Sequence, residues 1–186
     1  MQPLKISFWN NGKDGEIKVM MKQKNETVKS VVCLLVDNQP NVLARISSLI
    51  GRRNYNISTI TASETNTPGI TRITVVVNTD DEHVLNQVVA QTEKLEVVRR
   101  AYLLDMSNTL YRELLLVKVG VSDNERSAIR EIVDIFRAKI IDLSKNSMII
   151  ELTGSPEKID GFMDMMDSYE IMEVCRTGVT GIERGL

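Results

Sequence analysis

The chain has 186 residues, of which 42% are hydrophobic, and its 23 basic side chains nearly balance 25 acidic ones, giving a net charge of −2. This length and composition suffice for one large or two small globular domains with substantial hydrophobic cores. The balanced charge provides no extended positive field, which argues against nucleic acid as a partner.

The sequence has no recognisable secretory signal and only two cysteines, a combination that is typical of proteins in a reducing compartment. Residues 1–28 lack the apolar middle of a secretory signal, and the longest apolar run, residues 31–36, is far shorter than the ~20 residues of a membrane span. Cys33 and Cys175 make neither a disulfide framework nor a metal-ligand cluster, so we predict two buried or half-buried thiols. The sequence therefore predicts a cytoplasmic protein without a membrane contact.

Residues 1–28 form a polar, lysine-rich N-terminal extension. Asn10-Asn11-Gly12 is a turn signal between two short apolar runs, which predicts either a small hairpin or a disordered segment. No function is assigned to this extension.

From residue 31 onward, strand-like apolar runs alternate with a helical period of 3.6 residues. Strands are predicted over residues 31–36, 57–62, 70–77 and 95–104. The first predicted helix has an apolar face of Val42, Leu43, Ile46, Leu49 and Ile50. The second follows the acidic residues 80–82, and its apolar face consists of Val84, Leu85, Val88 and Val89.

The same order of elements then repeats. Strands are predicted over residues 114–119, 140–143, 147–152 and 173–177. The two helical faces are Ile129, Ile132, Ile135 and Phe136, and then Ile159, Phe162, Met163 and Met166. Ser122 and Glu125 have the spacing of a capping box before the first of these helices.

This repetition predicts an α+β protein with two ferredoxin-like βαββαβ domains in tandem. The first domain is predicted at residues 30–105 and the second at residues 112–186. Apolar periodicity lapses between them, so residues 106–111 are predicted to be a linker.

No constellation of residues predicts catalysis. His83 is the only histidine and stands at a predicted helix start, where a surface position is the simplest interpretation. The glycines of residues 178–185 have the wrong spacing for a phosphate-binding loop and better suit a docking edge. Aromatic residues make up only 4% of the chain, too few for the base-stacking surfaces of RNA-binding domains with this topology. We predict no catalytic residue, no metal site and no cofactor.

The junction at residues 37–45 carries the strongest binding signal. An apolar strand ends there in an amide-rich loop, and a helix begins whose first N–H groups and dipole attract a carboxylate such as that of an amino acid. Asn56 starts the next strand and offers an amide with donors and an acceptor. From the residues alone, Asn38 and Asn56 as ordinary turn residues remain the simpler interpretation.

Several motifs resemble a known family. Residues 38–46, 52–57 and 71–74 resemble the ACT domain of the regulatory small subunit of acetolactate synthase, also called acetohydroxyacid synthase. Residues 112–114, 136–142 and 173–178 resemble its C-terminal domain. The resemblance implies a non-catalytic subunit of branched-chain amino-acid biosynthesis. Such a subunit binds and activates a catalytic large subunit and confers feedback inhibition by valine, isoleucine or leucine, usually valine.

The same resemblance implies where an effector would bind and which cofactors to expect. Thiamine diphosphate, magnesium and FAD are expected only on the catalytic subunit. ACT domains of this family form a homodimer, with a small amino-acid effector at the interface. The matching positions are Asn38, Asn41, Val42 and Leu43 of one chain with Asn56 and Ile57 of the partner subunit.

Asn41 departs from the family pattern, which has glycine just before the helix. Its Cβ and amide would occupy space that a ligand approaches, although asparagine tolerates a positive φ better than most residues. We hypothesise that the chain still activates its enzyme but responds weakly to valine, or to a different effector. If the amide instead bonds the ligand, removing it should weaken binding.

Two alternatives have less support. A free-standing amino-acid sensor with ACT topology would need no enzyme partner, and the second half of the chain argues against it. A small phosphate-ester or acyl-phosphate hydrolase would need a positioned arginine. Arg45, Arg52 and Arg53 lie in or at the end of a helix, where solvated charge is the simpler interpretation.

Overall fold

The computed structural model describes residues 29–52, 55–79, 81–105 and 107–185. The described chain forms two compact domains, one of residues 29–111 with 178–185 and the other of residues 112–177. The predicted N-terminal hairpin or disordered segment at residues 1–28 lies outside the described residues.

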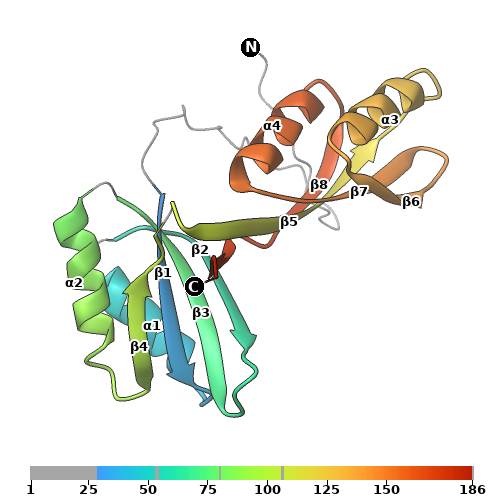
Figure 1. The fold of residues 1–186 in the computed structure, drawn as a ribbon. Coiled ribbons are helices and arrows are strands. Elements are labelled where there is room, and N and C mark those ends of the chain that lie inside the picture. Colours follow the sequence, from blue (N-terminus) through green and yellow to red (C-terminus); the bar gives the residue numbers. More distant parts are fainter. Residues whose placement is uncertain (1–28, 53–54, 80, 106, 186) are drawn as a thin grey trace. The chain divides into compact units, whose positions relative to one another are not determined.

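The first domain is an antiparallel sheet with two helices on one face (Figure 1). Its elements are β1 (Lys29–Asp37), α1 (Val42–Gly51), β2 (Ile57–Glu64), β3 (Ile70–Asn78), α2 (Glu82–Thr92) and β4 (Val98–Leu103). The strand order is β2-β3-β1-β4, which puts β2 and β4 at the edges. Alternate residues of β1 point to opposite faces. Val32, Leu34 and Val36 belong to the core under the helices, whereas Val31 and Cys33 belong to a smaller core on the other face.

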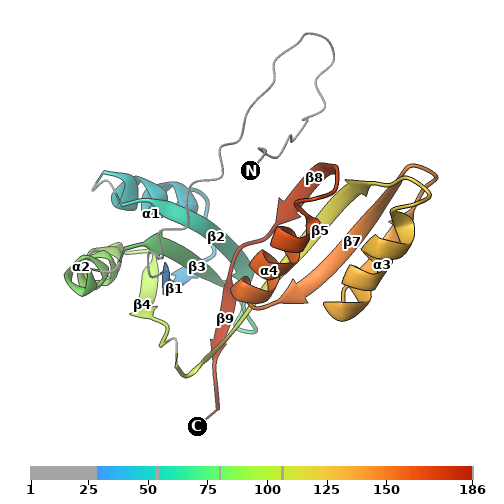
Figure 2. The same cartoon turned by 90° about the horizontal axis from the view of Figure 1, so that it is seen from above.

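The second domain repeats this order, with α3 and α4 side by side on one face of its sheet (Figure 2). Its elements are β5 (Thr109–Gly120), α3 (Arg126–Ile135), β6 (Lys139–Leu143), β7 (Ser147–Gly154), α4 (Pro156–Met166) and β8 (Ile171–Arg176). The strand order β6-β7-β5-β8 matches that of the first domain. The prediction of two ferredoxin-like βαββαβ domains in an α+β fold is therefore confirmed.

Two segments differ from the domain bounds expected from the sequence. β5 begins at Thr109, inside the expected linker, because Thr109 and Tyr111 alternate inward and are buried. A last strand, β9 (Thr180–Glu183), pairs with β5, and residues 178–185 group with the first domain rather than with the second.

Some predicted positions face solvent. Leu43 and Ile135, both expected on apolar helix faces, are exposed, and Val133 is buried in place of Ile135. Cys175 is exposed, contrary to the predicted burial, whereas Cys33 is buried.

The Ser122–Glu125 capping box forms in part. Glu125 accepts hydrogen bonds from the hydroxyl and N–H of Ser122, which lower its pKa, but it caps α3 through no side-chain bond of its own.

Two residues after the end of α3, Arg137 lies in the left-handed region, with a φ of 52°. The N–H of Ala138 donates to the carbonyl of Val133 at 2.8 Å, which closes the helix as a glycine usually does. We expect Arg137→Gly to raise the free energy of unfolding by about 1 kcal/mol, because glycine has no penalty at positive φ. Urea unfolding measures it. Arg137→Ala is the control, since it removes the side chain and keeps the penalty, and equal stabilities of the two variants would contradict the prediction.

Candidate functional site

A cavity of about 480 Å³ opens where β1 ends and α1 begins. The loop between β1 and α1 forms one wall, and the end of β2 with the start of β3 forms the other. Val36, Val42 and Ile73 give it an apolar floor, and Asn38, Ser63 and Glu64 give it a polar side. This mixture suits a small molecule that has both a hydrocarbon part and charged groups.

The start of α1 supplies hydrogen-bond donors to the cavity. The first intrahelical bond runs from the N–H of Arg45 to the carbonyl of Asn41 at 3.1 Å. The helix therefore gives no partner to the preceding N–H groups of Val42, Leu43 and Ala44, and all three residues line the cavity. Together with the helix dipole, these groups favour a carboxylate.

Asn41 occupies the cap position in the left-handed conformation, with a φ of 66°. Its side chain accepts no hydrogen bond from the first turn, although asparagine is a favoured capping residue. Asn41 also lines the cavity. Its amide therefore stands at the cavity without a capping role.

Glu64 is a polar residue of the cavity that the sequence analysis does not single out. The amide nitrogen of Asn38 donates to its carboxylate at 3.0 Å, and the N–H of Asn38 donates to the carbonyl of Gly69 at 2.8 Å. The loop is held further by an ion pair between Asp37 and Arg99 at 2.6 Å. A carboxylate at Glu64 and free N–H groups at α1 together match the two charged ends of an amino acid.

Four of the six residues expected to bind an effector, Asn38, Asn41, Val42 and Leu43, line this cavity. Asn56 and Ile57 lie at the other end of β2, beside Asn78 and Val77. At about 3.4 Å per residue, the length of β2 separates them from Glu64 by roughly 24 Å. One chain therefore does not bring all six together.

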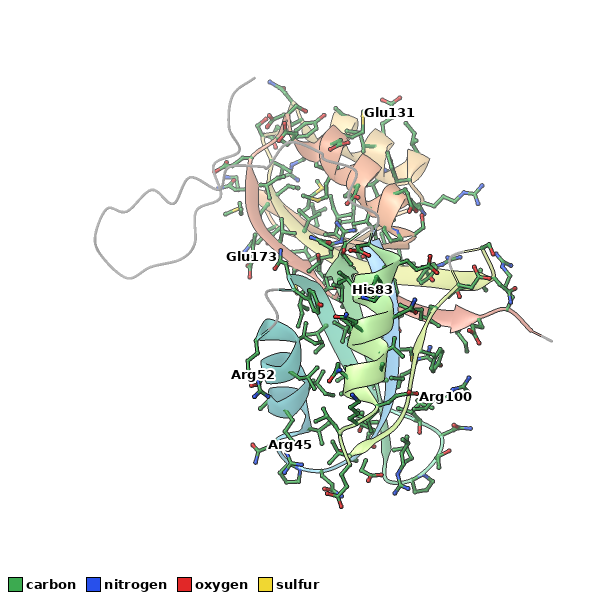
Figure 3. All side chains as sticks on the ribbon, turned by 90° about the vertical axis from the view of Figure 1, so that its left-hand side faces the viewer. Arg45, Arg52, His83, Arg100, Glu131 and Glu173 are labelled. Carbon is green, nitrogen blue, oxygen red and sulfur yellow. The ribbon has the colours of Figure 1, made fainter. Side chains whose placement is uncertain are left out.

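The other candidate groups are dispersed. His83 lies exposed on α2, where its ring nitrogen is 3.0 Å from the amide nitrogen of Gln87 (Figure 3). Arg45 lies exposed on α1, Arg52 lies exposed just after the end of this helix, and Arg53 is outside the described residues (Figure 3). Among the described residues, no group of three His, Cys, Asp or Glu side chains could hold a metal ion. Within the same ranges, no helix has the length and apolar character that crossing a membrane requires.

Comparisons with known proteins agree with these features. Residues 32–100 match a family model described as the AHAS small subunit-like ACT domain, and residues 112–185 match one described as the small subunit of acetolactate synthase. The chain is 41% identical over 156 residues to a probable acetolactate synthase small subunit of Methanothermobacter thermautotrophicus, covering 83% of this chain and 92% of that protein. For the acetolactate synthase small subunit of Bacillus subtilis, the identity is 35% over 158 residues, covering 85% and 92%.

A solved structure shows the same similarity. The crystal structure of the acetolactate synthase small subunit from Thermotoga maritima superimposes with a TM-score of 0.79 at 35% identity, covering 85% of this chain and 98% of that one. Both family models match in the order in which their motifs occur here. The chain therefore belongs to the acetolactate synthase small subunit family.

Proposed function

We propose that this chain is a non-catalytic regulatory subunit that activates the catalytic large subunit of acetolactate synthase and mediates feedback by a branched-chain amino acid. The observation that carries the effector part is the cavity at the start of α1. Its N–H donors suit a carboxylate, Glu64 suits an ammonium group, and the apolar floor suits an aliphatic side chain such as that of valine. Family membership supports the enzyme partner.

We further propose that the site is completed by a second copy of the chain. β2 is an edge strand, so its outer backbone groups can pair with another strand. Antiparallel two-fold pairing of β2 with its copy places the start of one strand beside the end of the other. Asn56 and Ile57 of the partner subunit would then reach the cavity near Glu64, and each homodimer would have two equivalent sites.

The chemistry itself is proposed to reside on the partner enzyme. Thiamine diphosphate, magnesium and FAD would be bound by the catalytic subunit, and this chain would act in the cytoplasm without a cofactor. The role of this chain would be binding and conformational coupling.

The test is acetolactate formation from pyruvate by the catalytic subunit of the same organism, with and without this chain, followed by a valine titration. We expect the rate to rise several-fold on mixing and then to fall with valine. Asn38→Ala should keep the activation and lose the inhibition, because it removes a polar group of the cavity. The control is Asn86→Ala, an exposed asparagine on α2. Absence of both activation and co-purification would overturn the proposal in favour of a free-standing sensor.

A further inference from the structure

The end of the chain lies on the first domain's sheet, on the face opposite its helices. We call residues 178–185 the strap; it includes β9, and only Thr177 separates it from β8, the last strand of the second domain. Figure 1 shows this dark red segment and the C-terminus in front of the first sheet. Val179 is buried in a cluster whose other members are Val31, Cys33, Val76, Leu104 and Tyr111. The strap therefore contributes to the second hydrophobic core of the first domain.

Polar contacts connect the strap to the two strands that line the cavity. A guanidinium nitrogen of Arg72 donates to the carbonyl of Gly181 at 2.6 Å, and the hydroxyl of Thr61 donates to the carbonyl of Val179 at 3.3 Å. Arg72 stands in β3 between two cavity residues, Thr71 and Ile73. Because successive strand residues point to opposite faces, the strap and the cavity occupy the two faces of the same strand pair.

The strap packs tightly against β2 at its first residue, Gly178. Gly178 has a φ of 82°, and a Cβ built on it would lie 2.5 Å from the Cβ of Thr59 in β2. No side chain fits there without displacing the strap or the strand. Near the other end, a Cβ on Gly185 would meet nothing within 4 Å. These two glycines give a matched pair for substitution.

The chain connects this seat directly to the second domain. Thr177 accepts a hydrogen bond from the N–H of Leu114 on its hydroxyl at 3.1 Å, and its own N–H donates to the carbonyl of Leu114 at the same distance. Thr177 is thereby fixed to β5, and the next residue, Gly178, is already packed on the first domain. Only Thr177 separates the strap from the end of β8 at Arg176, so a displacement of the strap would act on β8 through this one residue.

We propose that the strap couples the cavity to the second domain, so that effector binding changes how the strap is seated and lifting the strap uncouples inhibition from activation. This inference rests on the proposed function for its effector part. The coupling is carried by a discrete packed element with a seated and a lifted arrangement.

Cys33 reports whether the strap is seated. Its side chain is 0% exposed and belongs to the cluster that includes Val179, and burial raises the pKa of its thiol. Because the chain has only 2 cysteines, Cys175→Ser leaves Cys33 as the single thiol. The rate at which 5,5′-dithiobis(2-nitrobenzoic acid) labels Cys33 then measures opening of the strap.

In the Cys175→Ser background, we expect Gly178→Ala to speed labelling about tenfold, because the strained seat opens more often. Gly185→Ala should label at the parental rate. Arg72→Met is a second variant that lifts the strap without a backbone clash, and urea unfolding of each variant separates local opening from global instability. If both Gly178→Ala and Arg72→Met label at the parental rate, the proposal that the strap has a lifted arrangement is overturned.

The same variants are then mixed with the catalytic subunit. Gly178→Ala should keep activation and lose most of its inhibition by valine, whereas Gly185→Ala should behave as the parent does. Faster labelling with unchanged inhibition would overturn the coupling and leave the effector role intact. If the unsubstituted chain activates the enzyme but valine, leucine and isoleucine all fail to inhibit it, the effector part of the proposed function fails first, and the coupling fails with it.

Discussion

Replacing Arg176 with methionine is expected to lower the free energy of unfolding by about 3–5 kcal/mol, because it leaves a buried carboxylate without its cation. Glu113 in β5 is only 4% exposed and accepts a hydrogen bond from the guanidinium of Arg176 in β8. Another guanidinium nitrogen donates to Asp160 in α4 at 2.6 Å. These two carboxylates raise the pKa of Arg176 against the opposing effect of its burial. One side chain thus holds two strands and a helix of the second domain.

Urea unfolding at neutral pH measures this loss, and Arg99→Met is the control. The Arg99–Asp37 pair is as short as the Arg176–Asp160 pair, at 2.6 Å, but the side chain of Arg99 is 65% exposed, so its loss should cost far less stability. Adding Glu113→Met to Arg176→Met should recover much of the stability, because the unpaired charge is then removed. Equal losses for Arg176→Met and Arg99→Met would contradict the role of burial.

The sequence predicted the order of elements well because hydrophobic periodicity reports local structure directly. Its errors at Leu43 and Ile135 lie near helix ends, where an apolar residue can match the helical period and still face solvent. Cys175 is exposed although both thiols were predicted to be buried or half-buried, because the absence of a disulfide or metal partner does not determine which way a strand side chain points.

Contacts between residues that are far apart in the chain could not be predicted from the sequence. Glu64 meets Asn38 only because β2, β3 and β1 have a particular register, and no local pattern marks that contact across 26 residues. The strap has few apolar residues and one short strand, so its docking on the first domain depends on pairing with β5 and on the space that Gly178 leaves. The effector residues came from the family resemblance, and their role in binding remains a prediction.

Replacing Asn41 with glycine is expected to tighten valine binding about tenfold, which corresponds to about 1.4 kcal/mol. Asn41 lines the cavity beside the free N–H groups of α1, and its amide caps none of them. We therefore expect its side chain to narrow the approach of a carboxylate without a compensating bond in the helix. Glycine keeps the φ of 66° at no steric cost and opens that approach.

Calorimetry with valine on the two proteins measures the difference, and Arg137→Gly is the matched control. It relieves the same left-handed strain at a φ of 52° in the second domain and does not line the cavity, so it should raise stability and leave the affinity for valine unchanged. An equal gain of affinity in both glycine variants would trace the effect to general stability rather than to the cavity. Unchanged binding in Asn41→Gly would show that Asn41 does not crowd the ligand. Weaker binding would show that the amide of Asn41 bonds the ligand, and it would overturn the hypothesis that Asn41 weakens the response to valine.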